Sequence, residues 1–426
     1  MASNYEKIRE TNKWDYGRKT NHISYLGRLY SDRTHFIFEL LQNAEDAGAQ
    51  KVLFYLYKDK IIVKHDAARV FDENDVIGIC GVGEGTKTEN LNKIGTFGIG
   101  FKSVYAYTKS PEIHSGEEHF RIEHFVRPFK TEPIVPKSPW TTLFVLKFNN
   151  EEISQADAYN EIAKRLKNLK AKTLLFLRSI NEVEYRIEDD QSGVYLREQK
   201  VKNNISREVT VIGQNNGIEE DERWLVFEKP IDISDAEEKV YSEIGFKLTV
   251  DKEADTQKIQ TIKQSPLVVY FPTEKETNLG FLIQGPYKTT PARDNIPKDN
   301  ELNACLIKKT AAFLIEILHE LKKMNLLTVE LLKTLPIDSN SFPEESMFFP
   351  IYSEVKNALL NEELLPTNDG NYVSGKNAKL ARGSDLRNLL TQTYLQQLYD
   401  EEKINWLVGN ITSDKTPILR KYLLEK

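Results

Sequence analysis

Cysteine is scarce in this chain of 426 residues, which carries only Cys80 and Cys305, far apart in the sequence. Two distant cysteines exclude a disulfide scaffold and a cysteine-based zinc cluster, and such sparing use is typical of a reducing compartment. Long apolar runs are also absent, because no stretch reaches the roughly 18 residues that a membrane helix needs. We therefore expect a cytoplasmic protein without a membrane span.

The chain also lacks an excess of positive charge. The formal net charge is −6, which argues against nucleic acid binding over the whole surface but leaves a local basic patch open. Hydrophobic residues make up 40% and charged residues 29%, as in globular proteins with an ample core. The length suggests roughly two to four domains.

One stretch, "HFIFELLQNAEDAGAQ" at residues 35–50, combines a helical pattern with polar side chains. Apolar residues recur at helical spacing and predict a helix over residues 34–47. Asp32 precedes this pattern as a plausible N-cap, and Gly48 follows it as a plausible stop.

The same helix carries Glu39, Asn43 and Asp46 at intervals of four and three residues. Glu39 and Asn43 are one turn apart, so their side chains leave the same face. A carboxylate there can orient or deprotonate a water molecule, and a neutral amide oxygen suits Mg²⁺. The alternative is a solvated helix face.

Elsewhere the patterns change along the chain. The stretch "QKVLFYLYKDKIIVKHD" predicts a hairpin that turns at residues 58–60, and residues 153–179 suggest one long helix. Strand-like runs dominate from residue 182 onward. We expect a first domain at 1–181, a β-rich domain at 182–330 and a smaller α/β segment at 331–426, which we expect to continue into a longer parent protein.

Two glycine-rich patches, "GICGVGEGTKT" and "IGTFGIGFKSVYAYT", do not match the familiar phosphate loops. A P-loop needs lysine directly after its last glycine, but Phe101 separates Gly100 from Lys102. The GxGxxG fingerprint fails too, since Gly100 is followed by Phe, Lys and Ser and no strand comes directly before it. Glycine-dense main chain before a helix still suits an anion. A flexible turn is the alternative.

Taken together in this order, these features resemble the GHKL ATPases, the superfamily of gyrase, the heat-shock protein 90 chaperones, histidine kinases and MutL. The stretch "FELLQNAEDA" is similar to their N-box, with matches at Glu39, Asn43, Asp46 and Ala47. The stretch "KIGTFGIGFKSVYAYT" resembles their G2 box, GxxGxG, at Gly95, Gly98 and Gly100, and its wording is most similar to the sacsin-like branch. The resemblance implies that Ile99 and Phe101, next to these glycines, also contribute to nucleotide binding.

The resemblance implies a role for each matching residue. Glu39 would be the general base and Asn43 the Mg²⁺ ligand, while Asp66, at the end of "IIVKHD", would accept a hydrogen bond from the adenine amino group. Here "DAARV" replaces the usual DxGxG, so the loop beside the base must follow another path. Thr142 would hydrogen-bond near the adenine, although Thr141 stands where glycine is expected.

The phosphates would be held by the G2 glycines together with Lys87 or Lys102, under a lid at about 72–94. Lys102 could instead merely start the helix that follows the glycines. In chaperones of this class the β-rich second domain supplies an arginine to the γ-phosphate. Arg293, in "TTPARDNIP", resembles that group, and Arg127 or Lys288 could take its place.

The resemblance implies an α/β (α+β sandwich) fold of Bergerat type, followed by a β-rich transducer domain and a small C-terminal α/β segment. The implied activity is slow, Mg²⁺-dependent ATP hydrolysis that drives lid closure and domain rearrangement or homodimerisation, as in a chaperone with a protein client. Two alternatives stay open. One is an ATP-gated regulatory module of a defence or nucleic-acid-processing system, and the other is a nucleotide sensor that does not hydrolyse.

Overall fold

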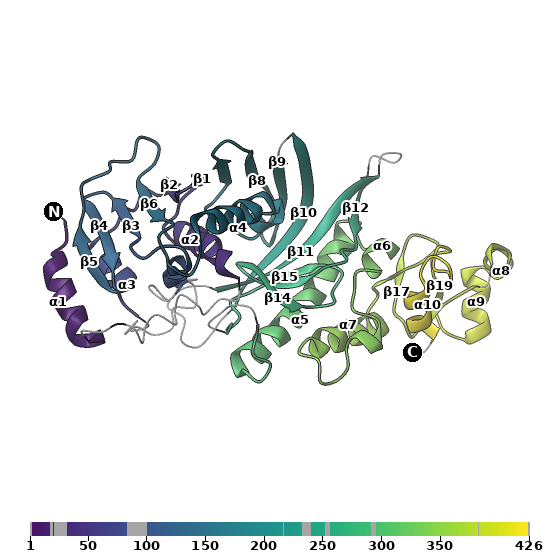
Figure 1. Ribbon diagram of the computed structural model, residues 1–426. Helices are drawn as coiled ribbons and strands as arrows, with labels where there is room; N and C mark the ends of the chain where they lie inside the picture. The colour runs from purple at the N-terminus through teal and green to yellow at the C-terminus, as the bar shows by residue number, and fades with distance from the viewer. Residues whose placement is uncertain are drawn as a thin grey trace.

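The chain folds into an elongated mixed α/β protein, with helix α1 at one end and helices α8 to α10 at the other (Figure 1). This confirms the predicted α/β class. The computed structural model describes residues 2–17, 20, 32–82, 100–215, 217–231, 240–251, 256–290, 295–381 and 383–424.

One large mixed sheet organises the described part of the chain. Its strand order is β14-β13-β15-β11-β10-β9-β8-β7-β1-β2-β6-β3-β4-β5, and β12 pairs with β11. The pairings β1–β7 and β13–β15 are parallel, and the others are antiparallel. The strands of its first half are β1 (Lys51–Leu56), β2 (Lys60–His65), β3 (Glu112–Ser115), β4 (Glu118–Glu123), β5 (Arg127–Lys130) and β6 (Thr142–Lys147).

The hairpin of β1 and β2 forms as predicted, because the Tyr57 amide donates to the Lys60 carbonyl at 2.8 Å. Strand β2 alternates between buried and partly buried residues, as a strand with one face on the core should. Helix α2 covers this core with its apolar side chains, which include Phe36, Ile37 and Leu40.

The helices of this half are α1 (Tyr5–Tyr16), α2 (Phe36–Asp46), α3 (Glu73–Cys80) and α4 (Gln155–Lys167), with 3-10 turns η2 (Arg33–His35), η3 (Gly100–Ala106) and η4 (Ala171–Leu174). The helix expected over 34–47 is confirmed as η2 followed by α2. Asp32 caps it by accepting from the Thr34 amide at 2.8 Å. Gly48 ends it with a φ of +76°, a left-handed conformation that costs glycine little.

The prediction of one helix over 153–179 is wrong, because α4 ends at Lys167. The four consecutive residues from Leu174 to Leu177 are all buried. A surface helix buries one stripe and exposes the opposite face, so it cannot bury four neighbours in a row. This segment instead crosses the core on its way to β7.

The β-rich second part joins the same sheet, because β7 pairs in parallel with β1. Its strands are β7 (Glu182–Ile187), β8 (Ser192–Asn203), β9 (Ser206–Asn215), β10 (Ile218–Ile231), β11 (Val240–Asp251), β12 (Thr256–Gln260), β13 (Pro266–Val269), β14 (Phe271–Glu276) and β15 (Leu282–Gln284). The expected boundary at 181/182 therefore falls inside one sheet, and the division into three units stays a prediction.

Two apolar cores lie along this sheet. The first surrounds α2 and continues to Tyr185 and Trp224 of the second part. The second lies beneath α5 (Glu301–Lys323) and reaches Leu419 near the C-terminal end. The remaining elements are α6 (Val329–Leu332), η5 (Ser339–Ser341), α7 (Phe349–Asn361), β16 (Leu365–Pro366), β17 (Tyr372–Val373), β18 (Ala378–Lys379), α8 (Ser384–Leu389), α9 (Gln392–Tyr399), β19 (Asn405–Trp406) and α10 (Pro417–Leu424).

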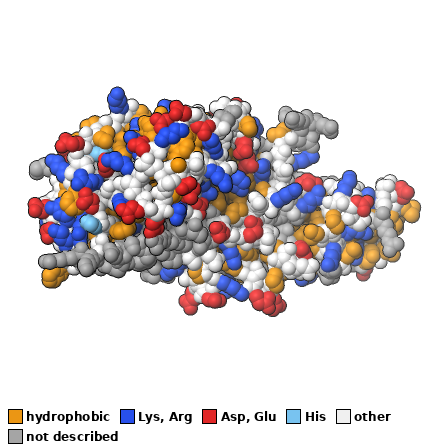
Figure 2. Space-filling view, viewed as in Figure 1, with side chains coloured by type: hydrophobic (Ala, Val, Ile, Leu, Met, Phe, Trp, Pro, Cys, Tyr) orange, Lys and Arg blue, Asp and Glu red, His pale blue; other side chains and the backbone are white. Residues whose placement is uncertain are grey.

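The outer surface mixes both signs of charge. On the face drawn in Figure 2, lysine and arginine side chains alternate with aspartate and glutamate, without a broad region of one sign. Among the described helices, none has the length and apolar character that a membrane crossing requires.

Lys102 is buried at the centre of the first half, with no exposed surface. Its ammonium donates to the Ile79 carbonyl and to the Phe125 carbonyl, both at 2.7 Å. Ile79 lies in the last turn of α3, whose carbonyls have no partner within the helix. Lys102 thereby ties η3 to the end of α3 and to the turn between β4 and β5. Burial lowers the pKa of Lys102 to about 8.

This burial predicts a particular pH dependence of stability. The pKa of Lys102 is about 8 in the folded protein, against an ordinary value of 10.5, so the unfolded chain holds this proton more tightly. Deprotonation of Lys102 in the folded protein therefore favours folding: this contribution is complete above about pH 10.5 and is lost as the pH falls through 8. Relative to Lys102→Met, the wild-type free energy of unfolding should rise by about 1.4 kcal/mol per pH unit within that window.

Thermal unfolding midpoints of both proteins across this window measure the difference. Lys109→Met is the matched control, because the Lys109 side chain is half exposed and pairs with Glu151 on the surface. A wild-type protein and Lys102→Met variant with parallel pH profiles would contradict the prediction.

Candidate functional site

Helix α2 carries the two residues around which the candidate site is built. Glu39 is 2% exposed and Asn43 is partly buried, although both are polar. They lie one turn apart beside the apolar stripe of α2, as their spacing predicts. A carboxylate held this deep in a helix that faces the core is not part of a solvated face, so that alternative is excluded.

The Glu39 carboxylate lies directly against the backbone of Gly100. A Cβ atom built on Gly100 would come within 1.9 Å of Glu39 Oε2, well inside any permitted contact. The two predicted residues, from the N-box and the G2 box, are therefore neighbours in space. A side chain at position 100 would therefore push the Glu39 carboxylate out of this position.

His35 contacts the other oxygen of this carboxylate. Its ring Nε2 donates to Glu39 Oε1 at 3.2 Å, and the imidazole is one-fifth exposed. A hydrogen bond of this kind fixes the orientation of a buried carboxylate and supports its negative charge. His35 was not predicted as a site residue, although its i, i+4 spacing to Glu39 places both side chains on one helix face.

Asp46 is the last residue of α2, and Ala47 is its C-cap. The Ala47 amide donates to the Asn43 carbonyl at 3.1 Å and so ends the regular ladder. Burial and the negative charge of Asp46 both raise the pKa of Tyr270, which identifies Tyr270 as a neighbour of this helix end. None of the hydrogen bonds among the described residues uses the Asn43 side chain, so its amide oxygen can serve a ligand.

Asp66, which the resemblance predicts to accept a hydrogen bond from adenine, makes structural hydrogen bonds to the backbone. Its Oδ1 accepts from the amides of Gln50 and Lys51, each at 2.8 Å, and so fixes the start of β1. The neighbouring His65 faces the core, where burial lowers its pKa to about 4. Adenine recognition by Asp66 stays a prediction.

The loop at residues 66–70 lacks the two glycines of the usual DxGxG pattern. No residue in 66–70 has a positive φ, so none of them needs the freedom of glycine. Thr141 holds the loop, because its hydroxyl donates to the Ala67 carbonyl at 2.6 Å. Thr142 is fully buried, and its hydroxyl lies 2.6 Å from that of Ser115. Its role near an adenine stays a prediction.

Two G2-box side chains point into the core. The Phe101 ring packs against Phe144, with 6.0 Å between ring centroids, so only its main chain remains for a ligand. Lys102 was expected to contact phosphate, but its ammonium is bound by two carbonyls in the interior. The structure therefore corrects this expectation: Lys102 holds η3 in place. A sequence cannot distinguish a lysine that faces a ligand from one that faces the core.

The remaining predicted residues lie outside the described part of the chain, and they are Lys87, Gly95, Gly98, Ile99 and Arg293. Of the lid expected at 72–94, the structure describes residues 72–82, which contain α3. Arg127, an alternative to Arg293, donates to the Gly17 carbonyl at 3.1 Å. Within the described ranges, no cluster of three or more His, Cys, Asp or Glu residues is arranged to hold a metal ion.

Comparison with known proteins adds sequence relatives. Residues 18–123 match the family model described as "Sacsin domain". The chain is 27% identical over 318 residues to Protein NO VEIN of Arabidopsis thaliana, and 34% identical over 123 residues to Sacsin of Homo sapiens. These alignments cover 68% and 24% of this chain, but only 11% and 3% of the relatives, so the chain spans a small part of either.

Solved structures with a similar fold include the B-subunit of the DNA gyrase from Myxococcus xanthus, with 13% identity and a TM-score of 0.30 over 50% of this chain and 68% of that one. The ATPase domain of Aquifex aeolicus MutL has 12% identity and a TM-score of 0.28 over 60% of this chain and 89% of that one. Similarities at this level carry no detail, so the assignment depends on the family match and on the two boxes. Over residues 18–123 the chain is similar to the Sacsin domain, and the match does not extend to the rest of the chain.

Proposed function

We propose that this chain binds ATP together with Mg²⁺ and hydrolyses it slowly. The observation that carries the proposal is the Glu39 carboxylate, buried between His35 and the bare backbone of Gly100 on a helix that also bears Asn43. The sacsin-like domain and the two GHKL boxes support the same ligand.

The residues present fit both ATP and Mg²⁺. Gly100 leaves main chain accessible beside a carboxylate, and glycine-dense backbone of this kind suits phosphate oxygens. Asn43 offers an amide oxygen, a ligand that hard cations prefer. Asn43 would hold the Mg²⁺ ion, which when bound would offset negative charge on the phosphates. Gly95, Gly98, Ile99 and Lys87 would complete the phosphate contacts, on the basis of the resemblance alone.

The chemical step we propose is attack of water on the γ-phosphorus of ATP, which breaks the bond to the oxygen that bridges the β- and γ-phosphates and releases ADP and inorganic phosphate. Glu39 accepts a proton from that water. Because the carboxylate is buried, bulk water does not compete for its oxygens. His35 holds Oε1 of Glu39, so that the carboxylate keeps one orientation. Arg293 would stabilise the charge that develops on the γ-phosphate, as an arginine finger does.

The output of the cycle is a second part of the proposal. Nucleotide binding would close a lid over the phosphates and drive domain rearrangement or homodimerisation, as in a chaperone that acts on a protein client. The formal net charge of −6 does not favour nucleic acid binding over the whole surface of this chain. An ATP-gated module in a defence or nucleic-acid-processing system remains the second candidate, and an effector domain in the parent protein would favour it.

Replacement of the proposed base separates binding from hydrolysis. In Glu39→Gln the amide cannot take a proton from water, so ATP turnover should fall by about 100-fold or more. Binding of ATP should change little, because size and position are kept. Phosphate release and a direct binding assay measure the two quantities. Equal turnover by Glu39→Gln and the wild type would show that Glu39 is not the base, and turnover by neither above background would make the chain a nucleotide sensor rather than an enzyme.

The close approach of Gly100 to Glu39 gives a steric prediction. In Gly100→Ala the new methyl group would overlap Glu39 Oε2, so the carboxylate or the 3-10 turn η3 must move. Overpacking typically costs 1–3 kcal/mol, and we expect ATP affinity to fall by roughly tenfold. Gly383→Ala is the matched control, since a Cβ there meets no atom within 4 Å. Equal affinity of the two variants would refute the predicted geometry.

Asn43 makes the Mg²⁺ requirement testable. In Asn43→Ala the candidate oxygen ligand is removed, so the Mg²⁺ concentration for half-maximal ATP binding should rise by roughly tenfold or more. Asn43→Asp keeps an oxygen at the same position and should retain Mg²⁺ dependence near the wild-type range. A titration of Mg²⁺ at fixed ATP measures this. An unchanged Mg²⁺ midpoint in Asn43→Ala would remove the residue from the proposed site.

A further inference from the structure

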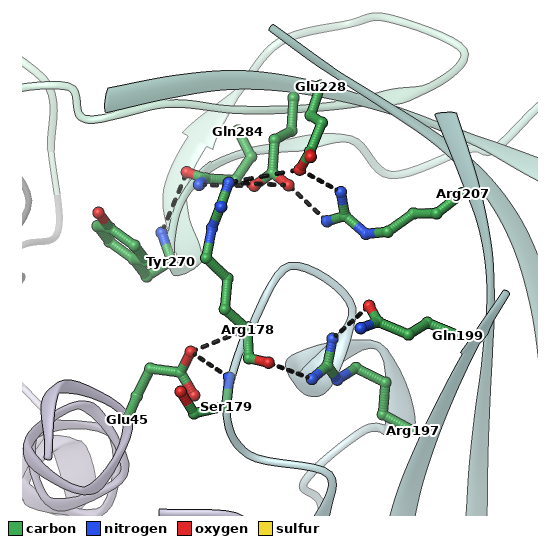
Figure 3. Close-up of polar contacts among 10 residues, drawn as sticks. Glu45, Arg178, Ser179, Arg197, Gln199, Arg207, Glu228, Tyr270 and Gln284 are labelled. Carbon is green, nitrogen blue, oxygen red and sulfur yellow. Dashed lines mark hydrogen bonds and ion pairs between the residues drawn. The ribbon is translucent and has the colours of Figure 1, made fainter. Parts of the chain in front are cut away.

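Glu45, on the same helix as Glu39 and Asn43, binds the main chain of a distant segment. It is 9% exposed, and its carboxylate accepts from three successive amides, of which Figure 3 shows those of Arg178 and Ser179. Oε1 accepts from the amides of Arg178 and Ser179 at 2.5 and 2.9 Å, and Oε2 from that of Ile180 at 2.8 Å. A carboxylate that accepts several amide hydrogens is strongly held, because each bond is charge-assisted.

The segment 178–181 is also held from its other side. Arg197, which is 4% exposed, donates to the Arg178 carbonyl at 2.9 Å and to the Ile180 carbonyl at 3.1 Å. It donates as well to Asn181 Oδ1 at 2.8 Å. Since both the amides and the carbonyls are bonded, this segment cannot shift without moving α2 or β8 with it.

The Arg178 side chain continues this connection into the strands of the second part. Its guanidinium lies over the Tyr241 ring at 4.1 Å and pairs with Glu228 at 3.4 Å and with Glu243 at 3.9 Å. Glu228 is on β10, and Glu243 is on β11 with no exposed surface. Arg207 joins the same two carboxylates at 2.5 Å each, so the acids sit in a closed cluster of charges.

A second contact leads from this cluster back to α2. Gln284 on β15 donates to Glu243 Oε2 at 3.0 Å and accepts from the Tyr270 amide at 3.4 Å. The next residue, Phe271, packs on Phe38 of α2 with ring centroids 5.2 Å apart. Two routes therefore connect α2 with Glu243, one through Glu45 and Arg178 and one through Phe38 and Phe271.

We propose that Glu45, Arg178, Glu228 and Glu243 form a joint, the Glu45–Arg178 joint, that transmits a displacement of α2 to strands β10 and β11. The physical reason is that a buried carboxylate cannot leave its partners without losing its charge-assisted bonds in a region that excludes water. A shift of α2 must therefore carry residues 178–180, and with them the Arg178 guanidinium. The trigger of that shift, occupancy of the Glu39–Asn43 face by nucleotide, rests on the proposed function.

Hydrogen exchange of the full chain, read by mass spectrometry, tests the joint in two arms. In the first arm, a non-hydrolysable ATP analogue with Mg²⁺ is added to the wild type. We expect slower exchange in α2 and in the parts of β10 and β11 around Glu228 and Glu243. In Arg178→Met, the α2 response should remain while the β10–β11 response falls by about half or more.

Arg186→Met is the matched control, because Arg186 is half exposed on β7 and pairs only locally with Glu184 at 2.7 Å among the described residues. It should respond as the wild type does. An Arg178→Met variant that keeps the full β10–β11 response would overturn the joint. If the wild type shows no response in α2 at all, the nucleotide proposal fails, and the second arm alone decides about the joint.

The second arm needs no nucleotide. Glu45→Gln replaces one acceptor oxygen by an NH₂ donor that faces amide donors, so exchange of residues 178–180 should become roughly tenfold faster. If the joint transmits, exchange around Glu228 and Glu243 should rise too, and adding Arg178→Met should increase it no further. Faster exchange confined to 178–180, with β10 and β11 unchanged, would show that Glu45 is a local anchor only.

Discussion

The approach of the Glu39 carboxylate to the backbone of Gly100 is the constraint on which the candidate site depends. It requires α2 and the 3-10 turn η3 to lie within van der Waals distance, so each must be fixed by the rest of the fold. Lys102 supplies one fixation, because its ammonium binds carbonyls of α3 and of the β4–β5 turn. His35 supplies another by holding the second oxygen of Glu39. Small displacements would close the space that glycine leaves open.

Buried charge recurs wherever two parts of this chain must keep one geometry. Lys102, Glu45 and Glu243 are all buried, and each is bonded to several polar groups. A buried charge without partners is costly, so such clusters favour one arrangement and penalise intermediate ones. The same property that fixes the site also gives the chain a means to pass movement from α2 to β10 and β11.

One continuous sheet joins the strands beside α2 to the strands of the β-rich part. Strand β7 pairs with β1, directly beneath α2, and then continues through β8 and β9 to β10. The strands before and after residue 182 are therefore joined by direct pairing of β1 with β7, although the sequence changes to strand-like runs at this point.

The sequence by itself determined the local features. Helical spacing between Asp32 and Gly48 predicted α2, and the apolar strands around residues 58–60 predicted the hairpin, because caps, turns and periodicity act over a few residues. Only the tertiary structure decided which polar groups face one another. In the structure, Lys102 faces the core rather than a ligand, and Asp66 accepts hydrogen bonds from two backbone amides. The helix that begins at Gln155 ends at Lys167. These outcomes depend on which side of a packed core a side chain occupies, and that is set by contacts between segments far apart in the chain.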